Sequence, residues 1–185
     1  AKELCERDFE ILGVDNINDY YDKKLKFDRI KNLEPYNNFN FIESDISDKI
    51  QITEVFNKFE PEKVVNLAAQ PGVRYSLINP DAYVNSNLQG FINIIELCRN
   101  KAVKGLIYAS SSSVYGDNRS KLFSVNDRVS KPISLYGATK RANELIAFSY
   151  SHLYDINTTG LRYFTVYGPW YRPDMAMHIF AKKIS

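Results

Sequence analysis

The sequence predicts an α/β fold, a Rossmann-like, doubly wound parallel sheet. Short strands of nearly continuous apolar character alternate with helix-like segments of about ten residues or more, which is typical of parallel sheets covered on both faces. The first strand ends in Asp15, as the second strand of a dinucleotide-binding fold ends in an acid. Because crossovers between parallel strands are right-handed, these units are expected to build a wound sheet.

The strands are predicted from apolar runs with clear ends. The first run ends in Asp15, the second ends in Asp45, and the turn at Pro71-Gly72 follows the third. The next run leads into a cluster of serines, and the last precedes Tyr167-Gly168-Pro169-Trp170. The predicted strands cover residues 9–15, 40–45, 63–69, 103–109 and 159–164.

The helices are predicted mainly from apolar residues at helical spacing. Asp48 is a candidate N-cap for a helix that Pro61 ends, whereas the helix beginning at Asp22 is polar and rich in lysine. Residues 1–7 resemble the end of a helix, and residues 116–133 are expected to form a loop. The predicted helices cover residues 22–33, 48–59, 80–99, 135–154 and 175–184.

Composition excludes several classes of protein. The 185 residues suit one domain with a real core, and 44% hydrophobic with 25% charged residues is ordinary for a soluble globular protein. The net charge of +2 comes from scattered Lys and Arg, which argues against nucleic acid as a partner. No apolar run reaches the roughly 18 residues of a membrane span. Cys5 and Cys98 form no metal-like cluster and are expected to be reduced core thiols, which favours a cytoplasmic location.

A hydroxyl cluster and a Tyr–Lys pair form the candidate catalytic apparatus. The apolar run 106–109 leads into Ser110–Ser113, and a later helix carries Tyr136 and Lys140. Residues four apart lie on one helix face, where an ammonium stabilises a phenolate and lowers the pKa of the phenol from about 10 toward neutrality. Such a phenol can take a proton from a sugar hydroxyl.

The Tyr–Lys spacing by itself is weak, because about one such pair is expected by chance in a chain this rich in both residues. The chain has a second pair, Tyr20 and Lys24, in a polar segment that no strand precedes. We interpret that pair as accidental. The serine cluster upstream and the apolar helix downstream single out Tyr136 and Lys140.

Five segments together resemble the extended short-chain dehydrogenase/reductases of the NAD-dependent epimerase/dehydratase family: Val14–Asn16, Asn66–Gln70, Ser110–Gly116, Tyr136–Lys140 and Leu161–Trp170. Three others narrow the resemblance to UDP-glucuronate 4-epimerases, including the capsular-polysaccharide type CapI. They are Asp15–Asp22, Ala69–Ser76, and Gly168–Trp170 with Arg172–Ala176.

The resemblance implies an isomerase that converts UDP-glucuronate to UDP-galacturonate through a 4-keto intermediate, with NAD as cofactor. It implies Tyr136 as catalytic base and acid, Lys140 as the residue that lowers its pKa and touches the nicotinamide ribose, and Ser111 as a bridge between substrate O4 and Tyr136. Ser112 and Ser113 stand where sugar-nucleotide dehydratases place Asp and Glu. Because serines cannot drive water loss, this argues against a dehydratase.

The resemblance also assigns binding residues around these groups. Asp15, with Asn16, would bind the adenosine ribose and so favours NAD over NADP. Asn87 is expected near the cofactor, more as a structural hydrogen-bonder than as a ligand. The other expected cofactor residues are Asp45 and Ile46 at the adenine, Ala68, Ala69 and Gln70 along the cofactor, and Tyr163 at the nicotinamide. The expected substrate residues are Ser112, Ser113, Thr165, Arg172 and Arg74, with Arg172 facing a phosphate or the glucuronate carboxylate.

The expected domain organisation is incomplete. Residues 1–170 are expected to form a partial NAD-binding domain and 171–185 the start of a substrate-binding region. The family's first strand and Gly-x-x-Gly-x-x-Gly turn are not in the sequence and are expected before Ala1. We therefore expect the central part of a longer protein, a homodimer when full length, that is inactive as this piece alone. Tyr171 stands where the family has Gly and is expected to crowd the sugar pocket, and Asp155–Asn157 replaces a usual Gly-Leu-Pro turn.

Three alternatives stay open from the sequence. Two are sibling enzymes, a UDP-glucose 4-epimerase and a UDP-glucuronate decarboxylase. The third is of another class, a remnant without catalysis that serves as an interaction or sugar-nucleotide-binding fragment. No metal site is expected, and His152 and His178 are interpreted as structural.

Overall fold

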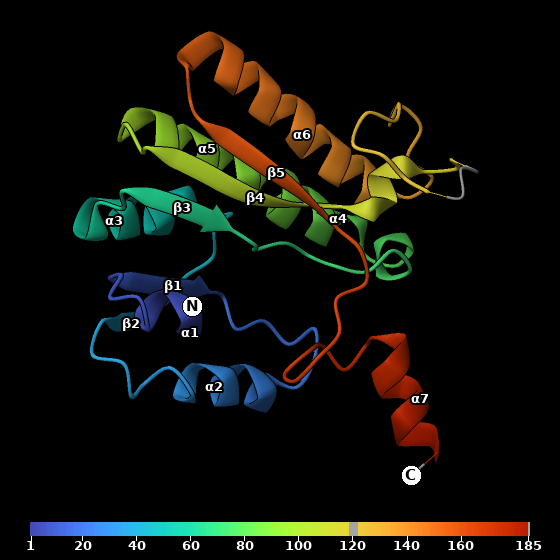
Figure 1. Ribbon diagram of the computed structural model, residues 1–185, viewed down its shortest axis with the longest axis horizontal. Helices are drawn as coiled ribbons and strands as arrows, with labels where there is room; N and C mark the ends of the chain where they lie inside the picture. Colours follow the sequence, from blue (N-terminus) through green and yellow to red (C-terminus); the bar gives the residue numbers. More distant parts are fainter. Residues whose placement is uncertain (119–121, 185) are drawn as a thin grey trace. The chain divides into compact units, whose positions relative to one another are not determined.

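A computed structural model describes residues 1–118 and 122–184 and confirms the alternating α/β pattern (Figure 1). The strands are β1 (Ile11–Asp15), β2 (Phe39–Glu43), β3 (Lys63–Asn66), β4 (Gly105–Ser111) and β5 (Thr158–Tyr163). The α-helices are α1 (Lys2–Cys5), α2 (Lys23–Lys31), α3 (Lys49–Phe59), α4 (Pro80–Tyr83), α5 (Gly90–Asn100), α6 (Leu135–Tyr154) and α7 (Ala176–Ile184). Within the described residues, no helix is long and apolar enough to cross a membrane.

All strand pairs are parallel, and they form two sheets, β1-β2 and β3-β4-β5. In the Rossmann order 3-2-1-4-5-6 the first strand separates strands two and three from strands four to six. Within residues 1–118 and 122–184, no further strand pairs with either sheet. Strand β4 is central in its sheet, and Ser111 at its end lies opposite Tyr163 of β5.

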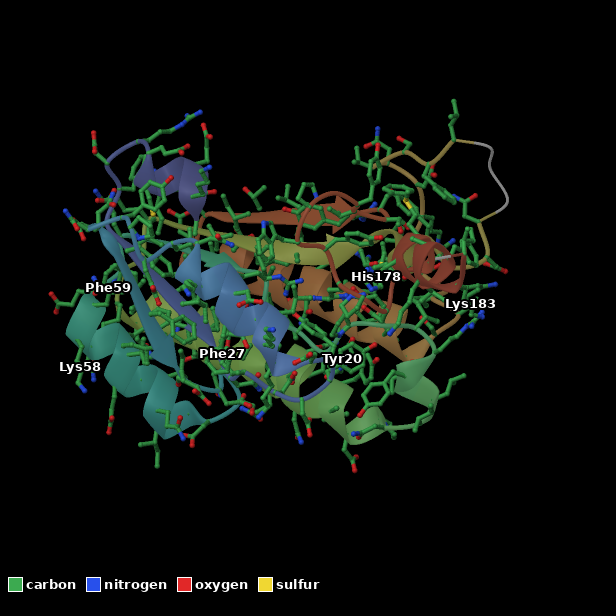
Figure 2. The ribbon with its side chains drawn as sticks, turned by 90° about the horizontal axis from the view of Figure 1, so that it is seen from below. Tyr20, Phe27, Lys58, Phe59, His178 and Lys183 are labelled. Atoms are coloured by element: carbon green, nitrogen blue, oxygen red, sulfur yellow. The ribbon has the colours of Figure 1, made fainter. Side chains whose placement is uncertain are left out.

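One compact unit comprises Ala1–Ser44 and Thr165–Ser185. Figure 2 shows Tyr20 on the loop before α2, Phe27 on α2 and His178 on α7. The Asp22 side chain caps α2 by accepting a hydrogen bond from the Lys24 N–H at 2.8 Å.

The second unit comprises Asp45–Phe164 and holds its core between one face of β3-β4-β5 and its helices. Figure 1 shows α5 and α6 against this sheet. Leu106 of β4 and Ile95 of α5 are buried, and the rings of Phe91 and Tyr108 meet edge-on at 5.2 Å. Successive right-handed crossovers in one direction place their helices on the same face. The opposite face exposes apolar side chains, among them Val65, which is 52% exposed.

The predicted helix over residues 80–99 is interrupted. Between α4 and α5 the chain runs through a π-helical segment, η2 (Val84–Gln89). Two short 3₁₀ segments, η1 (Tyr75–Leu77) and η3 (Ser112–Tyr115), follow β3 and β4. Single-turn π segments are frequent at functional sites, and this one carries the buried Asn87.

Candidate active site

The serine cluster forms a tight turn at the carboxyl end of β4, where ligands bind in open parallel sheets. Ser111 has an extended backbone, and its Oγ accepts a hydrogen bond from the Ser113 N–H at 3.2 Å. That bond uses an oxygen lone pair, so the hydroxyl hydrogen of Ser111 can still be donated. Ser111 is buried, whereas Ser112 and Ser113 are half-buried. We call residues Ser111–Ser113 the serine turn.

The first turn of α6 packs directly on the serine turn. The Ser134 side chain caps this helix by accepting a hydrogen bond from the Gly137 N–H at 3.0 Å. A Cβ atom on Gly137 would lie 2.7 Å from the Ser113 carbonyl oxygen, so glycine is what allows this approach. Tyr136, beside Gly137 and half-buried, therefore lies in the helical turn that touches the serine turn.

Lys140 lies one helical turn after Tyr136 and is buried, with 4% of its surface exposed. Its Nζ donates a hydrogen bond to the Ala109 carbonyl oxygen of β4 at 2.8 Å. Burial lowers the pKa of Lys140 to about 8. The structure thus places the helical turn of Tyr136 against the serine turn and Lys140 against β4, while the catalytic roles of these residues stay a prediction.

Tyr83 of α4 is a site residue that sequence reasoning missed. It is fully buried, its ring meets the Tyr136 ring edge-on at 6.2 Å, and its hydroxyl donates to the Pro71 carbonyl oxygen at 2.7 Å. Tyr83 therefore supports both Tyr136 and the loop after β3. Its place just before the apolar face of the predicted 80–99 helix gave only a weak signal, since that position is equally typical of an ordinary core residue.

Asn87 holds the predicted cofactor loop in place. The Gln70 N–H donates to Asn87 Oδ1 at 2.7 Å, and Asn87 Nδ2 donates to the Gln70 carbonyl at 3.1 Å and to Thr139 Oγ1 at 3.1 Å. These bonds are those of a structural hydrogen-bonder. Ala68 is exposed and Ala69 half-exposed on the same segment, where their small side chains leave room for a ligand.

The remaining predicted residues of this unit lie on different segments of the chain. The Asp45 carboxylate accepts hydrogen bonds from the Ser47 N–H at 2.8 Å and from Ser47 Oγ at 2.7 Å, which forms a turn before α3 and its N-cap Asp48. Ile46 is buried, and its carbonyl accepts from Asn93. Tyr163 ends β5, and Arg74 is exposed at the start of η1.

In the other unit, Asp15 ends β1 as predicted. Its Oδ1 accepts hydrogen bonds from the Ile17 N–H at 2.7 Å and from Lys26 Nζ at 3.3 Å. Lys26 is buried and also donates to Asn18 at 3.0 Å. Sequence reasoning missed Lys26, because nothing distinguishes it among the lysines of α2. Asn16 Oδ1 accepts from the Asn18 N–H at 3.2 Å.

Arg172 is paired with a carboxylate of the protein. Its Nε and Nη2 donate to Asp174 at 3.0 and 3.2 Å, and the Tyr20 hydroxyl donates to the same carboxylate at 3.1 Å. Thr165 is exposed. The Tyr171 ring meets the His178 ring edge-on at 5.9 Å, so its predicted crowding of a sugar stays a prediction. Among the described side chains, no group of three or more His, Cys, Asp or Glu could hold a metal ion.

A sequence profile of the NAD dependent epimerase/dehydratase family matches residues 1–185. The chain belongs to this family. Protein CapI of Staphylococcus aureus is 54% identical over 184 residues, which are 100% of this chain and 55% of CapI. UDP-glucuronate 4-epimerase 3 of Arabidopsis thaliana is 49% identical over 182 residues, which are 98% of this chain and 42% of that protein. The chain spans about half the length of the curated relatives it matches.

Among solved structures, a UDP-glucuronic acid 4-epimerase from Bacillus cereus in complex with UDP-glucuronic acid and NAD is similar, with a TM-score of 0.89 and 33% identity. The match covers 98% of this chain and 58% of that one. Membership of the NAD dependent epimerase/dehydratase family confirms the expected Rossmann-like fold, an enzyme family and its cofactor. The residues present fit that cofactor, since Asp15, the small Ala68 and the buried Lys140 each lie at or beside the carboxyl end of a strand.

Proposed function

We propose that the intact protein containing this chain is an NAD-dependent UDP-glucuronate 4-epimerase. The observation that carries the proposal is the packing of the first turn of α6, which includes Tyr136, on the serine turn, with Lys140 one turn later hydrogen-bonded to Ala109 of β4. The similarity to CapI and to plant and bacterial UDP-glucuronate 4-epimerases supports the choice of substrate. A cytoplasmic location and a homodimer stay predictions from the sequence.

Tyr136, as a phenolate, takes the proton from the sugar 4-hydroxyl. Lys140 favours the phenolate by placing a positive charge one helical turn away, and Ser111 donates its hydroxyl hydrogen to substrate O4. When bound, NAD would supply the hydride chemistry that a change of configuration at C4 requires. We assign Asp15 to the adenosine ribose and the Ala68–Gln70 loop to the body of the cofactor.

The residue types of the serine turn also favour an epimerase over a dehydratase. Dehydratases of this family place acids at the positions of Ser112 and Ser113, and hydroxyls at neutral pH cannot replace a carboxylic acid in water elimination. We assign these two serines to the substrate. Arg172 is assigned to the uronate carboxylate or a phosphate, which requires its bond to Asp174 to be exchanged for one to the substrate.

The proposal is tested by incubating the intact protein with UDP-glucuronate and, separately, with UDP-glucose. UDP-galacturonate without carbon dioxide is the expected product, and Tyr136→Phe should abolish it. A 4-epimer from UDP-glucose alone would replace the proposal by a UDP-glucose 4-epimerase. Release of carbon dioxide as the main reaction would indicate a decarboxylase, and no turnover of either sugar would favour a non-catalytic protein.

The carboxylate assignment has its own test. A 4-keto uronate is a β-keto acid, so a loosely held carboxylate leaves as carbon dioxide when the C5–C6 bond breaks. Arg172→Ala is expected to lower the epimer yield and to add a UDP-pentose. Arg7→Ala, which removes another exposed arginine–carboxylate pair of the same unit, should change neither. An unchanged epimer yield with no added UDP-pentose would refute this role of Arg172.

A further inference from the structure

Glu144 of α6 carries a partly buried carboxylate that the proposed chemistry does not use. It lies one helical turn after Lys140, and 10% of its side chain is exposed. Its Oε1 accepts hydrogen bonds from Ser110 Oγ at 2.6 Å and from Arg162 Nε at 2.8 Å. Its Oε2 accepts from Arg162 Nη2 at 3.0 Å and from Arg141 Nη1 at 2.8 Å.

Two arginine side chains, Arg162 and Arg141, surround the single carboxylate of this cluster. Burial raises the pKa of Glu144, but the hydrogen bonds from Arg162, Ser110 and Arg141 outweigh it and hold the pKa below its usual value. Arg162 forms a two-pronged pair with the carboxylate, a geometry that fixes orientation as well as charge. Glu144 is therefore ionised and held on both oxygens by β4, β5 and its own helix.

The cluster reaches both ends of the serine turn. Ser110 directly precedes Ser111 on β4 and is 2% exposed. At the other end, Arg162 Nη1 donates to the Tyr115 hydroxyl at 3.3 Å, and the guanidinium lies 5.1 Å from the centre of the Tyr115 ring. Tyr115 and Val114 are buried in a small apolar cluster with Val129. One carboxylate thus connects the residue before the turn to the residues after it.

We propose that Glu144 is a positioning residue that fixes the serine turn against the first turn of α6. Through Ser110 it holds the start of the turn, and through Arg162 and Tyr115 it holds the end. Because Tyr136 and Glu144 belong to the same rigid helix, the hydroxyl of Ser111 and the phenol of Tyr136 keep a fixed separation. An error of about 1 Å in such a separation can cost on the order of a hundredfold in rate.

The first test does not depend on the proposed function. Backbone hydrogen exchange is measured over residues 111–116 in the intact protein and in Glu144→Gln, which keeps the side-chain shape and removes the charge. Faster exchange by about tenfold or more is expected at this segment. The matched control is Glu96→Gln, because Glu96 accepts hydrogen bonds from Tyr150 at 2.5 Å and Arg99 at 2.8 Å in a similar cluster between α5 and α6. Unchanged exchange in Glu144→Gln, or equal loosening in Glu96→Gln, would overturn the proposal.

The second test rests on the proposed function and asks whether Glu144 acts through Ser111. Glu144→Gln is expected to lower kcat by about tenfold or more with little change in KM. When combined with Ser111→Ala, it should cost no further rate, because the residue it positions is gone. If the double variant instead lowers kcat by the product of the two separate effects, Glu144 acts through a residue other than Ser111.

A further variant covers the case in which Glu144→Gln does not fold. Ser110→Ala removes one hydrogen bond and leaves both arginine pairs, so it should show the same two effects in weaker form. If the wild-type protein does not epimerise a UDP-sugar, the proposed function fails while the exchange experiment still decides the positioning role.

Discussion

The Cα of Gly137 lies so close to the serine turn that a Cβ there would come within 2.7 Å of the Ser113 carbonyl oxygen and 3.1 Å of the Ser134 hydroxyl. Backbone atoms cannot move aside as a flexible side chain can. The close packing of the first turn of α6 on the serine turn therefore depends on the absence of a methyl group at residue 137. Glycine at this position is itself unfavourable for the helix.

Gly137→Ala should separate the effect of glycine on helix stability from its effect on the packing of α6 against the serine turn. Alanine favours the helix by about 0.5–1 kcal/mol over glycine, but its methyl group must push α6 away from the serine turn. Epimerase activity of the intact protein is expected to fall about a hundredfold. The neighbouring Ala138→Gly, at an exposed position, should lose about 1 kcal/mol of stability and keep its activity. Full activity in Gly137→Ala would mean that the close approach has no part in catalysis.

The lowered pKa of Lys140 predicts that the free energy of unfolding depends on pH. Burial lowers its pKa from 10.5 to about 8, so between these values the unfolded chain binds more protons than the folded one. Burial of the charged ammonium therefore destabilises the fold to its full extent below pH 8, and this destabilisation decreases as the pH rises to 10.5. Lys140→Met should be more stable than the parent at pH 7, by up to about 3 kcal/mol, and the difference should vanish near pH 10.5.

Urea unfolding at several pH values measures this difference. Lys104→Met is the control, since Lys104 is exposed beside Glu62 and should give no such trend. A methionine variant that is less stable than the parent at pH 7, or a difference that does not shrink with pH, would contradict a buried Lys140 with a lowered pKa.

A substitution at Asp155 is predicted to make the protein more stable against unfolding. It ends α6 in the left-handed conformation, with φ of 55°, and its N–H donates to the Ser151 carbonyl at 3.0 Å. Only glycine adopts this conformation without cost, so Asp155→Gly should gain about 0.5–1 kcal/mol in thermal or urea unfolding. The same substitution at Asp48 should instead lose a few tenths of a kcal/mol, because Asp48 caps α3 with its side chain. A loss at Asp155 would show that its side chain has a role in the native structure.

Local patterns predicted the elements well where local chemistry decides them. Helix α6 begins and ends where predicted, because Ser134 caps its start and Asp155 turns the chain at its end. Strand β3 is shorter than predicted, since the Asn66 side chain accepts a hydrogen bond from the Ala68 N–H at 3.2 Å and starts a turn. The π segment η2 was not predicted, because the spacing of apolar residues does not distinguish one π-helical turn from an α-helical turn.

The site was predicted only in part for a similar reason. Tyr136, Lys140 and the serine turn carry their chemistry in their residue types. Glu144 is instead defined by Arg162, 18 residues away, and Tyr83 by its contact with the ring of Tyr136. Nothing in the local sequence specifies such pairings. Supporting residues of this kind become visible only when the fold brings their partners together.

The binding of NAD by the 185-residue chain gives the last prediction. The Gly-rich turn of the family is not in this sequence, and that turn lets the cofactor pyrophosphate approach a helix N-terminus. Two lost hydrogen bonds to a charged phosphate weaken binding by about 3–6 kcal/mol, which is on the order of a hundredfold to ten-thousandfold. Titration of NAD followed by calorimetry is therefore expected to show no micromolar affinity, while the intact protein should bind. Micromolar binding by the chain alone would show that Asp15, the Ala68–Gln70 loop and Lys140 hold the cofactor without the turn.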